Sequence, residues 1–439
     1  MSHVFPRHTR ATLPTAMRGD GIYLYDSDGK SYLDGSGGAA VSCLGHGDPD
    51  VVAAIKTQLD RLEFAHTGFM TTDAAEELAD RLVAQAPEGI DRVYVVSGGS
   101  EAVEAALKLA RQYMIETGQQ ERTKFIARRQ SYHGNTLGAL GTGGNMWRRE
   151  PFDAVMVSAS HIAPCYEYRF REGHESAFDY GQRAANELEE ELLRLGPETV
   201  IGFIAEPVVG ATAGAVPAVD GYFRRIREIC DRYGILLILD EVMCGMGRTG
   251  HFFACEQDGV RPDIMTIAKG LGAGYQPIGA MLCSAEIYAA IETGSGFFQH
   301  GHTYIGHPVA CAAANAVVAK LTTGGLTKRA AEMGERLQEA LESRFGQHPN
   351  VGDIRGRGLF RALEFVEDRE TKSPFATDRR IAARLKAAAM ENGLICYPMS
   401  GTIDGRSGDH VLIAPPFIIT DTQIDELVDK LSDSIDAVI

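Results

Sequence analysis

Two residues capable of covalent and acid–base chemistry end two successive strand-like segments of this chain. Asp240 closes the apolar run ILLILD, and Lys269 closes DIMTIAK and is followed by glycine. A lysine among apolar neighbours has a lowered pKa and can act as a nucleophile in Schiff-base chemistry. A buried carboxylate needs a partner, and the carboxyl edge of an open α/β sheet is where ligands bind. Alternatively, Asp240 caps a helix or pairs with Arg248, and Lys269 marks where its strand reaches solvent.

A possible anion site precedes these residues in SGGSEAVEAALKLAR, residues 97–111. Here a strand ends, a glycine pair turns the chain, and a helix begins near Ser100. Free backbone N–H groups and the helix dipole at such a start attract phosphate, although an ordinary capped turn has the same features. An aldehyde cofactor with a phosphate and a basic ring nitrogen needs an anion site, an amine and a carboxylate. This turn, Lys269 and Asp240 would supply all three.

Other motifs favour a ligand less clearly. GMGRTG at residues 245–250 has the spacing of a dinucleotide-binding turn, but no clear amphipathic helix follows it. Asp240 and Glu241 would also repel a pyrophosphate there. HGHTYIGH at residues 300–307 has three histidines but no acidic residue at a spacing that completes a metal site, so no metal is expected. The step YHG at residues 132–134 is either a ring-stacking platform or a plain turn.

The segments that must position these residues alternate between strand and helix from about residue 51 to 320. Most of the strand-like runs are continuously apolar, which is typical of a parallel sheet covered on both faces; they lie at 92–96, 124–128, 200–207, 235–242, 263–269 and 279–284. With amphipathic helices between them, the pattern predicts an α/β fold with a doubly wound, mostly parallel sheet.

The two ends of the chain have a different pattern. Residues 21–34 predict a hairpin. The C-terminal part predicts a charged helix at 327–345, antiparallel strands at 351–366, 394–397 and 410–413, and helices at 378–392 and 422–437. We therefore expect an N-terminal arm at residues 1–50, a large domain at 51–325 and a C-terminal region at 326–439. The arm and the C-terminal region would together form a smaller α+β domain.

Composition excludes several classes of protein. The 439 residues include 43 Lys plus Arg and 59 Asp plus Glu, a net charge of −16, which argues against nucleic acid as a partner. No apolar run approaches the ~18 residues of a membrane span, and the N-terminus lacks the apolar core of a signal peptide. The eight cysteines have no CxxC spacing and are interpreted as reduced thiols. These features predict a cytoplasmic enzyme with no membrane partner.

Six segments, in order, resemble class III pyridoxal-phosphate aminotransferases: SGGSEAVEAALKLAR, SYHGNTLGAL, IAEPVVG, LILDEVMCGMGRTG, IAKGLGAGYQPIGA and HTYIGHPVACAAA. The resemblance extends from GIYLYDSDGKSYLDG to the C-terminal APPF. It implies the PLP-dependent transferase fold type I, with pyridoxal 5'-phosphate as the cofactor. It also implies a homodimer with shared active sites, or a tetramer, acting on a small amine or amino acid and an α-keto acid.

The resemblance also implies roles for individual residues. Lys269 would form the internal aldimine and move the proton between substrate and cofactor, and Asp240 would pair with the pyridinium nitrogen. Tyr132 and Val242 would cover the two faces of the ring. Gly99, Ser100 and, from the neighbouring subunit, Thr303 would bind the phosphate. His133 would be a further cofactor contact, and Glu206 would support the site around Asp240 and His133.

The residues at three positions resemble those of one subgroup of this family. Relatives that act on ornithine or 4-aminobutyrate usually have Arg, Glu and Gln where this chain has Asn135, Ala211 and Met243. The changes resemble the ω-amine/ω-amino acid:pyruvate transaminases, in which a mobile arginine before GDH binds the acceptor carboxylate. Arg406 in GRSGDH matches that arginine. Many subgroup members have Trp near Ala40, so this pocket is expected to be roomier or shaped for another donor.

The implied reaction moves an amino group from an ω-amine or an ω- or β-amino acid to an α-keto acid such as pyruvate, through pyridoxamine phosphate. Three alternatives remain open at this point. One is an aminomutase or a decarboxylating relative of the same fold. The others are an NAD-dependent dehydrogenase built on GMGRTG and a non-catalytic binding protein, although a scaffold has no reason to keep the pair of Lys269 and Asp240.

Overall fold

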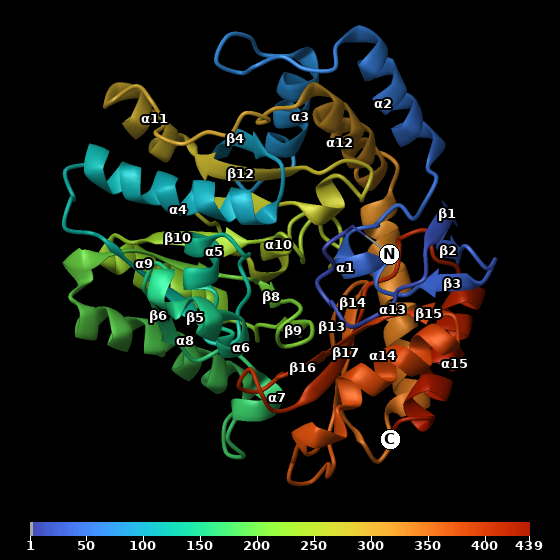
Figure 1. Ribbon diagram of the computed structural model, residues 1–439. Coiled ribbons are helices and arrows are strands. Elements are labelled where there is room, and N and C mark those ends of the chain that lie inside the picture. The colour runs from blue at the N-terminus through green and yellow to red at the C-terminus, as the bar shows by residue number, and fades with distance from the viewer. Residues whose placement is uncertain (1–2) are drawn as a thin grey trace.

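A seven-stranded sheet forms the centre of the computed structural model, which describes residues 3–439 (Figure 1). Its strand order is β4 (Ile90–Val96), β12 (Gly279–Ser284), β11 (Ile264–Ile267), β10 (Leu236–Asp240), β7 (Val200–Ala205), β5 (Lys124–Arg128) and β6 (Ala159–Ile162). β12 is antiparallel to both of its neighbours, and the other pairings are parallel. The predicted mostly parallel sheet is confirmed.

Helices cover both faces of this sheet, which explains why its strands are continuously apolar. On β10, Ile238 packs with the apolar side of α4 (Gly99–Glu116), whereas Leu237 and Leu239 pack with α8 (Ala177–Leu195) and α9 (Tyr222–Tyr233). The helix boundaries follow local signals. Gly234 ends α9 at φ +62°, in the left-handed region that glycine adopts easily. This arrangement leaves the carboxyl ends of the parallel strands free to carry polar residues.

An antiparallel sheet of the C-terminal region is the second layer. Its order is β13 (Val351–Arg357), β14 (Phe360–Phe365), β17 (Asp409–Ile413) and β16 (Tyr397–Ser400). The helices of this region are α13 (Leu326–Phe345), α14 (Ile381–Glu391) and α15 (Asp421–Asp436). These elements agree with the helices and most of the strands predicted for this part of the sequence.

A third sheet joins the two ends of the chain. The arm strands β1 (Ala16–Asp20), β2 (Tyr23–Asp26) and β3 (Ser31–Asp34) pair in order, and β15 (Leu394–Ile395) lies parallel to β3. The prediction of a single strand at 394–397 was wrong, because the chain changes sheet between β15 and β16. The smaller α+β domain thus combines the arm with the C-terminal region, as Figure 1 shows in blue and red. The exact domain limits stay a prediction.

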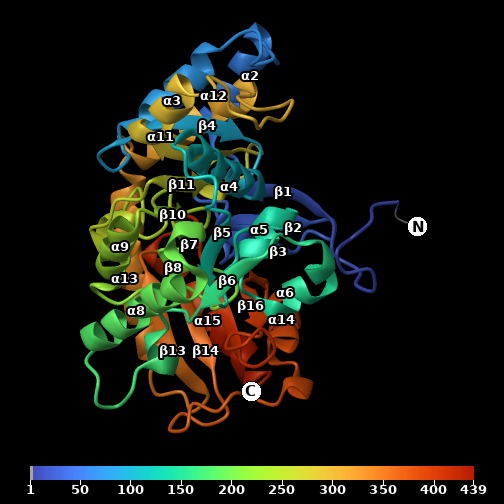
Figure 2. The ribbon, with the colours of Figure 1, turned by 90° about the vertical axis from the view of Figure 1, so that its left-hand side faces the viewer.

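The remaining elements are short or lie at the edges. Figure 2 shows α2, α3 and α12 at one end of the molecule and β13 and β14 at the other. The helices are α1 (Gly37–Ala40), α2 (Pro49–Arg61), α3 (Asp73–Val83), α5 (Leu137–Thr142), α6 (Met146–Arg149), α7 (Glu167–Phe170), α10 (Cys255–Asp258), α11 (Ala285–Thr293) and α12 (Pro308–Leu321). Two short strands, β8 (Val208–Val209) and β9 (Val216–Pro217), pair with each other, and 3-10 turns lie at Glu150–Val155, Pro197–Thr199, Lys269–Leu271 and Thr377–Arg379.

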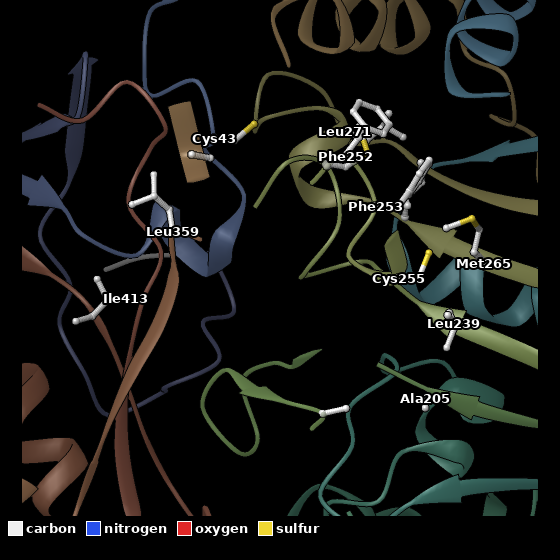
Figure 3. Packing of buried hydrophobic residues seen from close by; sticks show 14 of the residues in the cluster. Cys43, Ala205, Leu239, Phe252, Phe253, Cys255, Met265, Leu271, Leu359 and Ile413 are labelled. Atoms are coloured by element: carbon white, nitrogen blue, oxygen red, sulfur yellow. The ribbon is translucent and has the colours of Figure 1, made fainter. Parts of the chain in front are cut away.

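One continuous cluster of buried side chains links the central sheet to the smaller domain (Figure 3). Leu239 and Met265 lie on the sheet, Phe253 lies in the loop beyond β10, and Leu359 and Ile413 belong to the antiparallel layer. All eight cysteines are buried and free. Within residues 3–439 no single helix is long and apolar enough to cross a membrane, although α12 and α13 together meet that test across a 60° bend.

Candidate active site

A cavity of about 530 Å³ lies where the central strands end and α4 begins. Eight of the residues singled out from the sequence line it: Gly99, Ser100, Tyr132, His133, Glu206, Asp240, Val242 and Lys269. They come from four loops that follow β4, β5, β7 and β10 and from the turn after β11. In a parallel sheet these loops share one edge, so residues distant in sequence meet there.

Asp240, the last residue of β10, is 3% exposed and has three hydrogen-bond partners. Its Oδ2 lies 2.8 Å from His133 Nδ1, while Val242 N–H at 3.0 Å and the Thr266 hydroxyl at 3.3 Å donate to Oδ1. His133 is also buried, and its Nε2 has no partner among the described residues. The alternative pairing with Arg248 is wrong, because that guanidinium donates to the carbonyls of Leu359 and Pro415.

Glu206, just after β7, is a second buried carboxylate beside this pair. It accepts the backbone N–H of Tyr132 at 2.9 Å and that of Gly210 at 2.7 Å. Burial raises the pKa of Glu206, and the nearby His133 opposes that shift. The carboxylate thereby fixes the turn that carries Tyr132 and His133, which positions both residues against the cavity.

Lys269 lies just beyond β11, where a 3-10 turn begins. Its φ of +45° is unusual for a residue other than glycine. The backbone therefore turns sharply at Lys269, which lines the cavity. Burial lowers the pKa of Lys269, while the negative charges of Asp240 and Glu206 oppose the shift. A lowered pKa increases the fraction of neutral amine near pH 7, which is the nucleophilic form.

The start of α4 forms a cradle at one side of the cavity. Gly98 is the N-cap residue and provides no side-chain hydrogen bond to the first turn of this 18-residue helix. A Cβ at Gly99 would lie 2.8 Å from Val242 Cγ1, and one at Gly134 would lie 2.6 Å from Ser100 Oγ. Ser100 Oγ in turn accepts the backbone N–H of Asn135 at 3.1 Å. Open N–H groups, a hydroxyl and small residues together suit a phosphate.

Two of the predicted residues lie outside this cavity. Thr303 is exposed on the loop before α12. Arg406 is also exposed and forms an ion pair with Glu150, which lies just after α6. Neither side chain contributes to the cavity of its own chain in this structure.

The alternative motifs are not supported by the structure. The segment GMGRTG folds into turns rather than opening a helix, and α10 beyond it has only four residues. This explains why it cannot form a dinucleotide-binding turn, which needs the start of a long helix. Among residues 3–439 there is no cluster of His, Cys, Asp and Glu suited to a metal, so the histidines of 300–307 do not form one.

Several residues of the site were not found from the sequence. Val41 comes from the arm, and Gln276 and Ile278 come from the loop before β12. Arg148 does not line the cavity, but its Cζ lies 4.8 Å from the centroid of the ring of Tyr132, which does. No spacing rule marks these positions, since each reaches the site only through long-range packing.

Comparisons with known proteins identify the family of this chain. Residues 4–435 match the family described as aminotransferase class-III. An uncharacterized aminotransferase of Schizosaccharomyces pombe is 48% identical over 423 residues, which cover 96% of this chain and 92% of the relative.

Solved structures give the same result. An (S)-enantioselective omega-transaminase from Thermomicrobium roseum superposes with a TM-score of 0.93 at 37% identity, covering 100% of this chain and 96% of the other. The omega-transaminase from Pseudomonas jessenii in complex with PMP does so with a TM-score of 0.93 at 33% identity, covering 99% and 96%. The chain therefore belongs to the class III aminotransferases, a family of enzymes that use pyridoxal phosphate.

Proposed function

We propose that this enzyme is an ω-aminotransferase that moves an amino group from an ω-amine or an ω- or β-amino acid to an α-keto acid, with pyruvate as the acceptor. The observation that carries the proposal is that Lys269 and Asp240 line one cavity at the ends of adjacent strands, beside the uncapped start of α4. An amine, a buried carboxylate and a phosphate cradle are the three groups that pyridoxal phosphate requires.

The residue types that line the cavity suit this cofactor chemically. The cradle of Gly99 and Ser100 would bind its phosphate, and Asp240 would pair with its ring nitrogen. Tyr132 and Val242, both in the lining, would cover the two faces of the ring. When bound, pyridoxal phosphate supplies an aldehyde that reacts with amines and a ring that withdraws electrons from the substrate Cα.

Three residues of the site would have distinct roles. Lys269 Nζ would hold the cofactor and would move a proton at the substrate Cα, for which a lowered amine pKa is favourable. The Asp240 carboxylate would keep a proton on the ring nitrogen, and its contact with His133 Nδ1 at 2.8 Å fixes its orientation. Glu206 acts indirectly, because it holds the backbone of the turn that carries Tyr132 and His133.

The substrate class is proposed from the subgroup features. The solved neighbours described as omega-transaminases share the fold over nearly the whole chain. Asn135, Ala211 and Met243 are in keeping with that subgroup, and Met243 lines the cavity. Arg406 would bind the acceptor carboxylate after leaving Glu150, and it would stay outside when an uncharged amine enters.

We propose a homodimer in which Thr303 reaches the phosphate of the other subunit. Large apolar side chains lie exposed near this loop and in the segment between α2 and α3: Phe69 is 87% exposed, Met70 68%, Phe297 63% and Tyr304 62%. Exposed apolar side chains in such number are typical of an interaction surface. We also propose a cytoplasmic location, since a reducing compartment keeps cysteines such as these in the free thiol form.

The visible spectrum of the purified protein tests the cofactor. We expect a yellow chromophore that borohydride bleaches and fixes to the peptide containing Lys269, as mass spectrometry would show. A colourless protein that takes up no added pyridoxal phosphate would contradict the proposal. A panel of amine donors and keto acids, assayed by keto-acid consumption, then identifies the substrates. Release of carbon dioxide, or turnover without a keto acid, would instead identify a decarboxylating relative or an aminomutase.

A further inference from the structure

Beside the cavity lies a guanidinium group that has no carboxylate partner among residues 3–439. Arg148 Cζ is 4.8 Å from the centroid of the Tyr132 ring and 5.8 Å from that of the Trp147 ring. Within residues 3–439 the side chain makes no ion pair, and its buried Nε has no hydrogen-bond partner. Cation–π contacts hold a guanidinium in place but do not neutralise it. Among residues 3–439, therefore, no carboxylate pairs with Arg148, which lies next to a residue of the cavity wall.

Hydrogen bonds fix the position of this arginine relative to the site. The Asn145 side chain caps α6 by accepting the backbone N–H of Arg148 at 3.3 Å. Asn145 Nδ2 also donates to Gln130 Oε1 at 3.2 Å, and Gln130 is two residues before Tyr132. Gln130 Nε2 donates to the carbonyl of Thr402 at 3.0 Å. The Gln130 side chain thus joins three segments: α6 with Arg148, the turn with Tyr132 and the loop before Arg406.

The charges around Tyr132 support an anion at this place. Burial raises the pKa of the Tyr132 hydroxyl, and the positive charge of Arg148, whose Cζ lies 4.8 Å from the ring centroid, opposes that shift. Arg7 of the arm acts in the same direction, whereas Tyr397 and Asp240 act in the opposite one. Since the hydroxyl stays protonated at neutral pH, it can donate a hydrogen bond together with the guanidinium.

The contrast with Arg406 is informative. Arg406 forms an ion pair with Glu150, and Glu150 lies only two residues after Arg148 in the sequence. An anion approaching the cavity would have to displace Glu150 from Arg406, but it would displace no carboxylate from Arg148.

We propose that Arg148 binds the carboxylate of the amino donor, so that the enzyme prefers ω-amino acids to uncharged amines of the same length. The inference rests on the proposed function, because it places the donor's amino group at Lys269 and its carboxylate beside Tyr132. A guanidinium donates to a carboxylate through two parallel hydrogen bonds, which adds both affinity and orientation. This interaction favours donors that have a carboxylate at the end opposite the amine, and it does not affect the reaction of the amine.

Two matched donors test this assignment. The compounds 4-aminobutyrate and n-butylamine have the same chain and amine and differ in the carboxylate. In Arg148→Met we expect kcat/KM for 4-aminobutyrate to fall by about tenfold to a hundredfold, the effect of losing a hydrogen bond to a charged group, with n-butylamine within about twofold. Arg148→Lys keeps the charge without the planar fork and should give an intermediate loss. Arg224→Met, which removes an exposed arginine on α9, is the control and should change neither value.

A binding measurement makes the test independent of turnover. Calorimetry with butyrate, which carries the carboxylate but no amine, should give a Kd that Arg148→Met raises about tenfold or more and Arg224→Met leaves unchanged. An unchanged Kd, or an equal loss for both donors, would overturn the assignment, the latter by showing that Arg148 only positions Tyr132. Failure of the proposed function differs from this, because it appears as an absence of transamination by the unmodified enzyme with any donor.

Discussion

Replacing Gly134 with alanine should damage the phosphate cradle in a way that the structure quantifies. Gly134 has a φ of +134°, and a Cβ there would lie 2.6 Å from Ser100 Oγ and 3.0 Å from Ala139 Cβ. Holding an L residue at such a φ costs about 1–3 kcal/mol, and overpacking a tight site costs about 1–3 kcal/mol more. We therefore expect Gly134→Ala to lower the free energy of unfolding by about 2–6 kcal/mol.

The matched control is Gly118→Ala, just beyond the opposite end of α4. Gly118 also has a positive φ, of +75°, but a Cβ there would meet nothing within 4 Å. It should therefore show only the backbone cost. Denaturant unfolding of both variants measures the difference, which we expect to be about 1–3 kcal/mol.

The functional assay is the affinity for pyridoxal phosphate. Displacing Ser100 Oγ removes a hydrogen bond to a charged group, worth about 1.5–3 kcal/mol, so the Kd of Gly134→Ala should rise about tenfold or more. The Kd of Gly118→Ala should stay at the value of the unmodified protein. Equal affinity in the two variants would refute the assignment of this turn as the phosphate cradle.

Three further predictions concern single side chains. Lys269→Ala should fold and unfold like the unmodified protein but lose transamination by at least a thousandfold and lose the borohydride-fixed adduct, and full activity would contradict the mechanism. Burial raises the pKa of Glu241 to about 7 from a usual 4.5, so the folded state favours the protonated carboxyl. The free energy of unfolding, measured at each pH and compared with that of Glu241→Gln, should therefore fall by about 3 kcal/mol from pH 4.5 to 7 and then level off. Arg406→Ala should weaken the use of keto acids much more than that of amines, and Glu150→Gln should slightly lower the KM for the keto acid, whereas equal effects on donor and acceptor would disprove the role of Arg406.

Much of the candidate site follows from local sequence patterns. Continuous apolar runs that end in Asp240 and Lys269 predicted two adjacent strands with polar ends, because burial on both faces requires such runs. The glycine pair before Ser100 predicted a helix start open to an anion, and the structure has α4 beginning there. Each of these patterns lies within one short segment, so it can be recognised from the sequence without knowledge of the tertiary structure.

Other features depend on contacts between distant segments. His133 meets Asp240 across 107 positions, and Arg406 meets Glu150 across 256. The strand 394–397 was divided for the same reason, since only the packing of the arm against the C-terminal region decides that β15 joins β3.

The sequence by itself therefore determined the class of fold and placed Lys269 and Asp240 at the ends of two strands, because periodicity and strand ends are local properties of the chain. Only the tertiary structure decided the partners of these groups. It brings His133 to Asp240 and Glu150 to Arg406, and it leaves Arg148 beside Tyr132 with no carboxylate partner among residues 3–439. The physical reason is that pairing energy depends on distance and burial in space. Spacing along the chain does not encode these quantities once strands are ordered out of sequence.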